Sequence, residues 1–131
     1  MTDETPLIRI LSVDDHPLLR SGIGALIATQ PDMQLVAEAA NGKEAVQLYR
    51  EFRPDVTLMD LQMPKMDGLE ATAAIRQLPG YQDVPILALT ANYSDEIRQQ
   101  CQQNGMQGFL SKPVSKVALW SEVSRWLNLS E

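Results

Sequence analysis

Hydrophobic residues occur along the chain in five short runs, and each run is followed by a segment with apolar residues at helical spacing. The runs are almost continuously apolar, which is typical of parallel strands covered on both faces. We place these strands at residues 8–13, 35–39, 56–59, 85–90 and 107–110. Strands that alternate with helices through right-handed crossovers predict an α/β fold with an open, doubly wound sheet.

The first two intervening segments carry signals for helix starts. Pro17 suits the first turn of a helix, and Asn41 followed by Glu44 resembles a capping box. The first helix is expected to bury one apolar side, made of Leu18, Leu19, Ile23, Leu26 and Ile27. Pro54 is expected to end the second helix before the third strand.

Three further helices follow in the second half of the chain. One is expected at about residues 69–77 after the Asp67-Gly68 turn, and one at about residues 95–104, ending at Gly105. The last helix carries Leu119, Trp120, Val123, Trp126 and Leu127 on one side. We expect its two tryptophans to anchor it to the sheet.

Polar residues stand where four of the predicted strands end. Asp14-Asp15 ends the first strand, Asp60 follows the third, Thr90 ends the fourth and Lys112 follows the fifth. The carboxyl ends of parallel strands lie at one edge of a doubly wound sheet, so we expect these side chains to meet there. A single aspartate after a strand is more often a helix cap or turn residue. The prediction therefore depends on their joint placement.

Composition limits the classes of function. The 131 residues suit one domain, and a net charge of -6 disfavours direct binding of nucleic acid. No apolar run approaches the ~18 residues of a membrane span. The lone Cys101 excludes an intrachain disulfide and favours the cytoplasm. We expect one domain over residues 1–131, without an output domain and without membrane contact.

The expected cluster favours phosphoryl-transfer chemistry. Crowded carboxylates repel one another, and a hard divalent cation such as Mg²⁺ relieves this repulsion through oxygen ligands. Lys112 could grip a phosphoryl oxygen, and Thr90 offers a hydroxyl donor. Asp60 would then act as the nucleophile.

Three other classes of protein remain as alternatives. A phosphatase of the haloacid dehalogenase type needs a second aspartate two residues after its nucleophile, but Gln62 stands there. A flavodoxin-like cofactor binder needs a phosphate-binding loop after the first strand, but that loop carries two acids. An interaction module that no longer takes phosphate would not need the complete set of acids, threonine and lysine.

The chain resembles the receiver domain of two-component response regulators, in the superfamily of the chemotaxis receiver CheY, over about residues 7–128. The resemblance is carried by Asp14-Asp15, the segment MDLQMPKMDG around Asp60, Thr90 in LALTAN, and Lys112-Pro113. It implies a flavodoxin-like (βα)5 fold with strand order 2-1-3-4-5. It also implies a signalling switch rather than an enzyme, which assists its own phosphorylation and dephosphorylation.

The resemblance assigns a metal site. Asp60 would take a phosphoryl group from the phosphohistidine of a sensor kinase. Asp15 and Asp60 would bind Mg²⁺ directly, with Mn²⁺ as a substitute, and Asp14 would act through a water molecule. The backbone carbonyl of Gln62 would be a further ligand. His16, beside these acids, is expected to be a loop histidine rather than a ligand.

The resemblance also assigns a switch. Lys112 would pair with Asp60 and then with the phosphoryl group, in a segment whose Lys112-Pro113 peptide is often cis in the family. The Thr90 hydroxyl would swing to the same group, and Phe109 would turn inward in response. Expected partners are a sensor histidine kinase or phosphotransfer domain, and a homodimer or output domain through the face of helix 4, strand 5 and helix 5.

The two halves of the chain resemble different receiver subfamilies. Motifs such as VDDHPLLRSG resemble receivers that precede helix-turn-helix output domains, whereas NGMQGFLSKPV resembles receivers of hybrid sensor kinases. The chain is thus either a natural intermediate or a chimera with its junction near residues 78–80. Either origin leaves the site chemistry unchanged.

Overall fold

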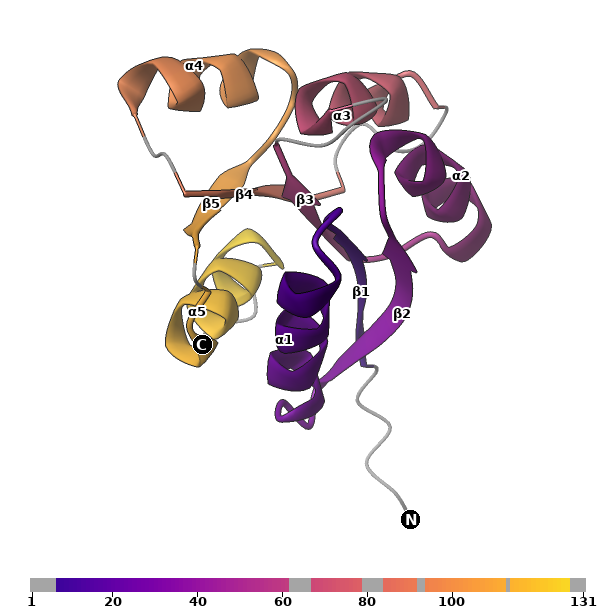
Figure 1. Ribbon diagram of the computed structural model, residues 1–131, viewed down its shortest axis with the longest axis vertical. Helices are drawn as coiled ribbons and strands as arrows, with labels where there is room; N and C mark the ends of the chain where they lie inside the picture. Colours follow the sequence, from indigo (N-terminus) through magenta and orange to yellow (C-terminus); the bar gives the residue numbers. More distant parts are fainter. Residues whose placement is uncertain (1–6, 62–66, 79–83, 92–93, 113, 128–131) are drawn as a thin grey trace.

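The computed structural model describes residues 7–61, 67–78, 84–91, 94–112 and 114–127. Five parallel strands form one sheet in the order β2-β1-β3-β4-β5, and helices alternate with them along the chain, which confirms the predicted fold and strand order (Figure 1). The elements are β1 (Ile8–Val13), α1 (Pro17–Ala28), β2 (Met33–Ala39), α2 (Gly42–Phe52), β3 (Val56–Asp60), α3 (Gly68–Arg76), β4 (Ile86–Thr90), α4 (Asp95–Gln103), β5 (Gly108–Ser111) and α5 (Lys116–Leu127).

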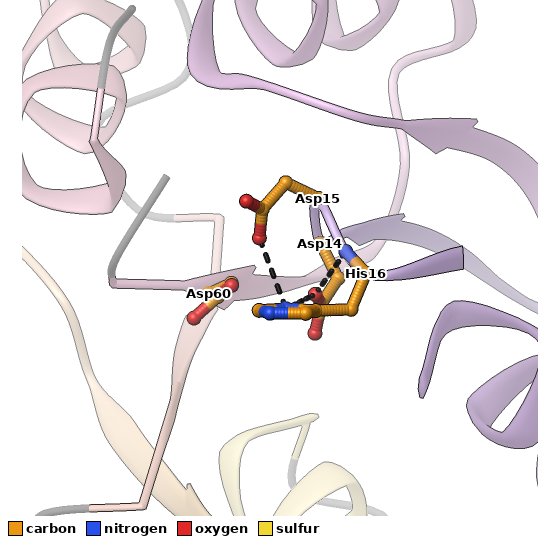
Figure 2. A group of neighbouring side chains, drawn as sticks. All are labelled: Asp14, Asp15, His16 and Asp60. Atoms are coloured by element: carbon orange, nitrogen blue, oxygen red, sulfur yellow. Dashed lines mark hydrogen bonds and ion pairs between the residues drawn. The ribbon is translucent and has the colours of Figure 1, made fainter. Parts of the chain in front are cut away.

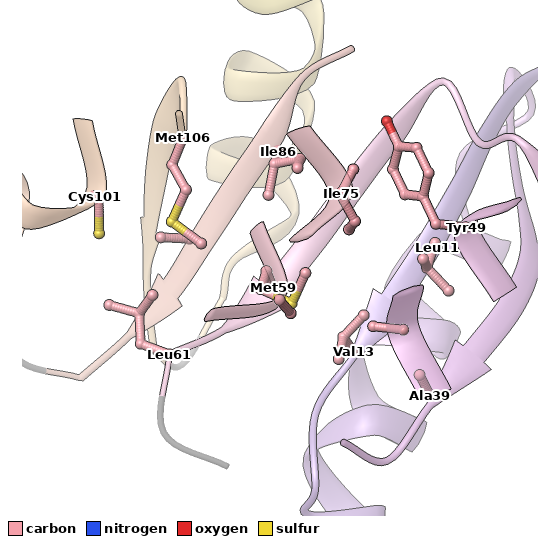
Figure 3. Packing of buried hydrophobic residues seen from close by; sticks show 13 residues of the cluster. Leu11, Val13, Ala39, Tyr49, Met59, Leu61, Ile75, Ile86, Cys101 and Met106 are labelled. Atoms are coloured by element: carbon pink, nitrogen blue, oxygen red, sulfur yellow. The ribbon is translucent and has the colours of Figure 1, made fainter. Parts of the chain in front are cut away.

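The helices cover both faces of the sheet. In Figure 1, α1 and α5 lie on one face, and α2, α3 and α4 lie on the other. Two hydrophobic clusters correspond to these layers. Ile23 and Ile27 of α1 join Leu119 and Val123 of α5 in the first cluster. The second, shown in Figure 3, packs residues of α2, α3 and α4 on the opposite face of the strands.

The buried thiol of Cys101 belongs to the second cluster. Its burial raises the pKa of the thiol, so Cys101 stays neutral and packs as a small apolar side chain. Among the described residues, no helix combines the length and the apolar character needed to cross a membrane.

Side-chain caps explain where α2 and α3 begin. Asn41 accepts a hydrogen bond from the backbone N–H of Glu44, as predicted. The Glu44 carboxylate, however, bonds the N–H of Ala40 rather than that of Asn41, so the reciprocal half of the expected box is shifted by one residue. A complete capping box instead joins Asp67 and Glu70 at the start of α3. Asp67 was expected in a simple turn, and α3 therefore begins one residue earlier than predicted.

Several boundaries and three exposed side chains differ from expectation. The strand β2 begins two residues before the predicted 35–39, and β5 is shifted by one residue from 107–110. Leu18 and Leu19 of α1 are 86% and 38% exposed, so neither lies in the core. Trp126 of α5 packs against the first cluster as expected, whereas Trp120 is 38% exposed. Helical spacing placed these residues on apolar faces but could not show where the neighbouring elements stop covering them.

Arg76, at the end of α3, clamps the turn between α4 and β5. Its Nε and Nη2 donate to the carbonyl of Gly105 at 3.0 and 2.7 Å, and Nη2 also donates to Gln107 Oε1 at 2.9 Å. The same Gln107 oxygen accepts the backbone N–H of Ile86 at the start of β4, at 2.8 Å. Gly105 has a φ of +93°, and a Cβ there would lie 3.0 Å from Arg76 Nε. The turn therefore needs glycine for both its backbone conformation and its contact with the guanidinium.

Replacing Arg76 tests the contribution of this clamp. We expect Arg76→Ala to lower the free energy of unfolding by about 2 kcal/mol, because charge-assisted hydrogen bonds to the turn are lost. Urea denaturation followed by circular dichroism measures this change. The control is Arg98→Ala, which removes an exposed arginine whose pair with Asp95 spans 3.6 Å; its effect should stay within about 0.5 kcal/mol. Equal losses in both variants would show that the clamp stabilises no more than a surface ion pair.

Candidate functional site

The register of the strands brings the acidic residues together. Val13 of β1 lies opposite Met59 of β3, so the next residues, Asp14 and Asp60, emerge side by side at the carboxyl edge. On the far side of β3, Asp60 lies opposite Leu89 of β4, one residue before Thr90. This is also the point where the chain crosses from one face of the sheet to the other, because β1 lies between β2 and β3.

Lys112 arrives at the same edge from β5. Thr90 lies opposite Ser111, and the Thr90 carbonyl accepts the backbone N–H of Lys112 at 2.9 Å. The Lys112 ammonium reaches between two carboxylates, 3.1 Å from Asp60 Oδ1 and 3.3 Å from Asp14 Oδ2. The side chains of Asp14 and Asp60 are 0% and 4% exposed. Two buried carboxylates thus share one ammonium group.

Asp15 and His16 complete the cluster on its solvent side. The imidazole Nδ1 of His16 lies 3.1 Å from Asp14 Oδ1 and 3.1 Å from Asp15 Oδ1. One ligand atom from each of Asp14, Asp15, His16 and Asp60 lies within 4.8 Å of the others. Figure 2 shows the imidazole ring turned toward the carboxylates. Asp14 and Asp15 do not cap α1, whose N-cap residue is His16 and whose cap lacks a side-chain hydrogen bond.

A small cavity opens beside this cluster. It has a volume of about 280 Å³, and its lining includes Asp60, Thr90 and Lys112 together with His16, Leu19, Leu61, Leu89 and Ala91. Thr90 is 8% exposed. The nucleophile candidate, a hydroxyl and an ammonium group therefore border one space that is large enough to admit a phosphoryl group.

Gly68, the first residue of α3, packs closely on the end of β3. A Cβ on Gly68 would lie 2.2 Å from the carbonyl oxygen of Asp60 and 2.9 Å from Cα of Leu61. The N–H of Gly68 also donates to the Leu61 carbonyl at 3.1 Å. The start of α3 thus packs directly on the backbone that carries Asp60, and only glycine leaves room for this contact.

The structure brings together the residues that the sequence predicted to meet, namely Asp14, Asp15, Asp60, Thr90 and Lys112. Phe109 lies elsewhere, half-buried on β5, and lines a separate cavity of about 380 Å³ with residues of α4 and α5. The backbone carbonyl of Gln62 and the Lys112-Pro113 peptide lie outside the described residues, as does most of the junction proposed near residues 78–80.

One contact that holds the backbone of Asp14 was not predicted from the sequence. Arg20 of α1 donates through Nη1 to the backbone carbonyl of Asp14 at 2.6 Å, and its Nε bonds Glu38 Oε1 at 3.1 Å. Arg20 thereby ties the loop after β1 to the end of β2. Arg20 lies six residues after Asp14, about one turn into α1. No sequence pattern distinguishes it from an ordinary surface arginine.

The donor set fits a hard divalent cation. Three carboxylates, from Asp14, Asp15 and Asp60, face the single ammonium group of Lys112, so the cluster carries excess negative charge. Carboxylate oxygens are the ligands that Mg²⁺ prefers, and one or two of them suffice when water completes the coordination. Asp15 is 27% exposed and leaves the cluster open to solvent.

Comparison with known proteins identifies one family. The response regulator receiver domain family matches residues 10–124. The transcriptional regulatory protein YdfI of Bacillus subtilis is 41% identical over 112 residues, which are 86% of this chain and 51% of YdfI. The chain thus spans about half the length of the curated relatives it matches.

Solved structures of similar chains agree in fold. A two-component response regulator of the LuxR family from Aurantimonas sp. SI85-9A1 superposes with a TM-score of 0.86 at 36% identity, over 95% of this chain and 88% of that one. The receiver domain of the sensor histidine kinase PA1611 from Pseudomonas aeruginosa PAO1 gives a TM-score of 0.83 at 34% identity, over 93% and 98% of the two chains. That receiver holds a magnesium ion coordinated in its active site cleft.

Replacing Gly68 tests the close packing beneath Asp60. We expect Gly68→Ala to lower the free energy of unfolding by about 1–3 kcal/mol, because the added methyl group must displace the Asp60 carbonyl. NMR spectra should show the amide shifts of Asp60 and Leu61 changing most. The control is Gly22→Ala on the exposed side of α1, where a Cβ meets nothing within 4 Å. That variant should gain about 0.5–1 kcal/mol from helix propensity. A neutral Gly68→Ala would contradict the packing argument.

Proposed function

The chain belongs to the family of response regulator receiver domains, and from this premise we propose that Asp60 is its phosphoacceptor in two-component signalling. Receiver domains of this family are phosphorylated on an aspartate with the help of Mg²⁺. The observation that carries the assignment to Asp60 is its buried carboxylate, which belongs to the acidic cluster, pairs with Lys112 and borders the cavity. Family membership favours this function over the dehalogenase-type and flavin-binding alternatives.

The proposed step is an in-line transfer of one phosphoryl group. An oxygen of the Asp60 carboxylate attacks phosphorus of a phosphohistidine on a kinase or phosphotransfer domain. The new O–P bond forms as the N–P bond breaks, and the electron pair of the broken bond returns to the donor imidazole. The product is an acyl phosphate on Asp60. Attack of water on the same phosphorus later releases inorganic phosphate, so the domain assists both its modification and its reversal.

Lys112 and Thr90 orient the incoming group. The Lys112 ammonium already bonds Asp60 Oδ1, and it can follow the charge onto a phosphoryl oxygen without leaving the cluster. The Thr90 hydroxyl borders the same cavity and can donate to a second phosphoryl oxygen. Thr90 ends β4 and Lys112 follows the neighbouring strand β5, so the sheet holds both residues in a fixed position relative to Asp60.

Mg²⁺, with Mn²⁺ as a substitute, would neutralise charge on the carboxylates and on the phosphoryl oxygens during transfer. We propose that Asp15 and Asp60 hold it directly and that Asp14 acts through water, with the backbone carbonyl of Gln62 as a further ligand. Support comes from the oxygen donor set of this chain and from the magnesium ion described for the PA1611 receiver. Asp14 is fully buried and already contacts Lys112 and His16, so it suits an indirect role in metal binding, through a water molecule.

Phosphorylation would be read out through Thr90 and Phe109. Movement of the Thr90 hydroxyl toward the phosphoryl group frees space on the α4 side of the sheet, and Phe109 turns inward to fill it. Phe109 lies opposite Ala88 on β4, two residues before the Thr90–Ser111 pair. The domain is therefore proposed as a signalling switch, with α4, β5 and α5 as the surface for a homodimer or output domain.

An apolar groove beside the site suits the phosphodonor protein. It has a volume of about 300 Å³, and its lining combines two residues of the charged site, Asp14 and Lys112, with Leu18, Leu19, Gly22, Ile23 and Leu26 of α1 and with Val114. Leu18 is 86% exposed there. We assign this groove to the phosphohistidine-bearing domain, since a partner seated on it reaches Asp60.

We also propose that the protein is located in the cytoplasm. Nucleic-acid binding by the longer relatives does not bear on this chain, because the chain spans only about half of their length.

Reaction with acetyl phosphate tests the assignment of Asp60. With Mg²⁺ present, intact-mass spectrometry should detect one added phosphoryl group, and peptide mapping should place it on Asp60. Chelation of divalent cations should abolish the adduct, and so should Asp60→Asn. Asp55→Asn is the control, because Asp55 lies at the opposite end of β3 and bonds Arg9. An adduct that survives Asp60→Asn would refute the assignment.

A second experiment tests the groove. Transfer from a phosphorylated histidine kinase, selected from a panel for fastest reaction with the native chain, is compared with transfer from acetyl phosphate. We expect Leu18→Gln to slow the kinase reaction at least about tenfold more than the acetyl phosphate reaction, because only the kinase needs the apolar contact. Val117→Gln on α5, which replaces another side chain that is 75% exposed, should slow the two reactions equally. Equal slowing by Leu18→Gln would exclude the groove as the docking surface.

A further inference from the structure

His16 is a member of the acidic cluster to which the proposed function gives no role. It follows Asp15 directly and occupies the N-cap position of α1, but its side chain makes no capping hydrogen bond to the helix. The ring is 61% exposed, yet its Nδ1 lies 3.1 Å from an oxygen of Asp14 and 3.1 Å from an oxygen of Asp15. The imidazole is thus turned over the carboxylates (Figure 2), where its nitrogen faces the space between them.

The spacing of the four side chains suits a single bound ion. Ligand atoms of Asp14, Asp15, His16 and Asp60 lie within 4.8 Å of one another. Two ligands on opposite sides of an ion, each bound at about 2.1 Å, lie about 4.2 Å apart. His16 Nδ1 is already closer than this to Asp14 and Asp15, so only a small movement is needed for all four side chains to bind the same ion.

A nitrogen ligand changes which metals such a cluster prefers. Carboxylate and water oxygens suit Mg²⁺, whereas imidazole suits Zn²⁺, Cu²⁺ and Ni²⁺. We propose that His16 adds a nitrogen ligand to the carboxylate cluster, which raises the affinity of this site for the nitrogen-preferring ions Zn²⁺, Cu²⁺ and Ni²⁺ relative to Mg²⁺. The inference rests on the proposed function, because it uses the same carboxylates.

Ligation requires one rearrangement within the imidazole. In the present contacts Nδ1 faces two carboxylates and acts as a hydrogen-bond donor to them. To bind a metal, Nδ1 must present its lone pair, and the ring proton then resides on Nε2. Because the ring is 61% exposed, that proton remains within reach of water.

Calorimetric titration of Zn²⁺ and of Mg²⁺ into the tag-free chain tests the proposal at one fixed pH. We expect His16→Gln to raise the Kd for Zn²⁺ at least about tenfold, and to raise the Kd for Mg²⁺ by a much smaller factor, because only the nitrogen-preferring ion loses a favoured ligand. Mg²⁺ should displace Zn²⁺ from the native chain. Glu51→Gln removes an exposed carboxylate on α2 and is the control for non-specific binding; it should change neither Kd.

Pulsed electron paramagnetic resonance with Cu²⁺ provides a direct readout. His16 is the only histidine in the chain, so an imidazole nitrogen coupled to Cu²⁺ identifies it without ambiguity. The native chain should show this coupling and His16→Gln should not. Absence of the coupling in the native chain, or equal losses of Zn²⁺ and Mg²⁺ affinity in His16→Gln, would show that His16 only donates a hydrogen bond.

The outcomes separate this inference from the proposed function. If the native chain forms the Asp60 adduct but Zn²⁺ affinity is independent of His16, only the ligand role of His16 fails. If Zn²⁺ binding depends on His16 but acetyl phosphate leaves Asp60 unmodified, the phosphoacceptor assignment fails and the metal preference stands.

Discussion

Two buried carboxylates, Asp14 and Asp60, share the single ammonium group of Lys112, and the rest of the site depends on this arrangement. Like charges brought together away from water repel strongly, and one cation cannot satisfy both. Asp14 relieves part of the excess through the backbone N–H of His16, at 2.9 Å. The remainder favours binding of a second cation.

The fold keeps these charges together by fixing the backbone beneath them. The Val13–Met59 pairing sets Asp14 beside Asp60, and the close approach of Gly68 fixes the carbonyl of Asp60. At the other end of α3, the side chain of Arg76 bonds the turn that leads into β5. The helix that packs on the backbone of Asp60 is therefore also linked to the strand that carries Phe109.

Much of this arrangement could be predicted from the sequence, for identifiable reasons. Continuous apolar runs that end in Asp14-Asp15, Asp60 and Thr90 indicate parallel strands, and the carboxyl ends of parallel strands meet at one edge. Contacts between distant segments could not be predicted. Helical spacing gave no sign that Leu18 would lie in an open groove or that Trp120 would be exposed, since burial depends on the neighbouring element. His16 was expected to be a simple loop residue because no pattern shows which way a side chain turns.

The contact between Trp126 and β5 has a practical consequence. A Cβ on Gly108 would lie 2.4 Å from the indole Nε1 of Trp126, so the ring rests against the strand backbone directly before Phe109, and Nε1 donates to Glu122 at 3.0 Å. The chain has two tryptophans, and the other, Trp120, is partly in solvent. The indole of Trp126 is thus a native fluorophore placed beside the strand that carries Phe109. Its emission would register a displacement of β5 without any attached dye.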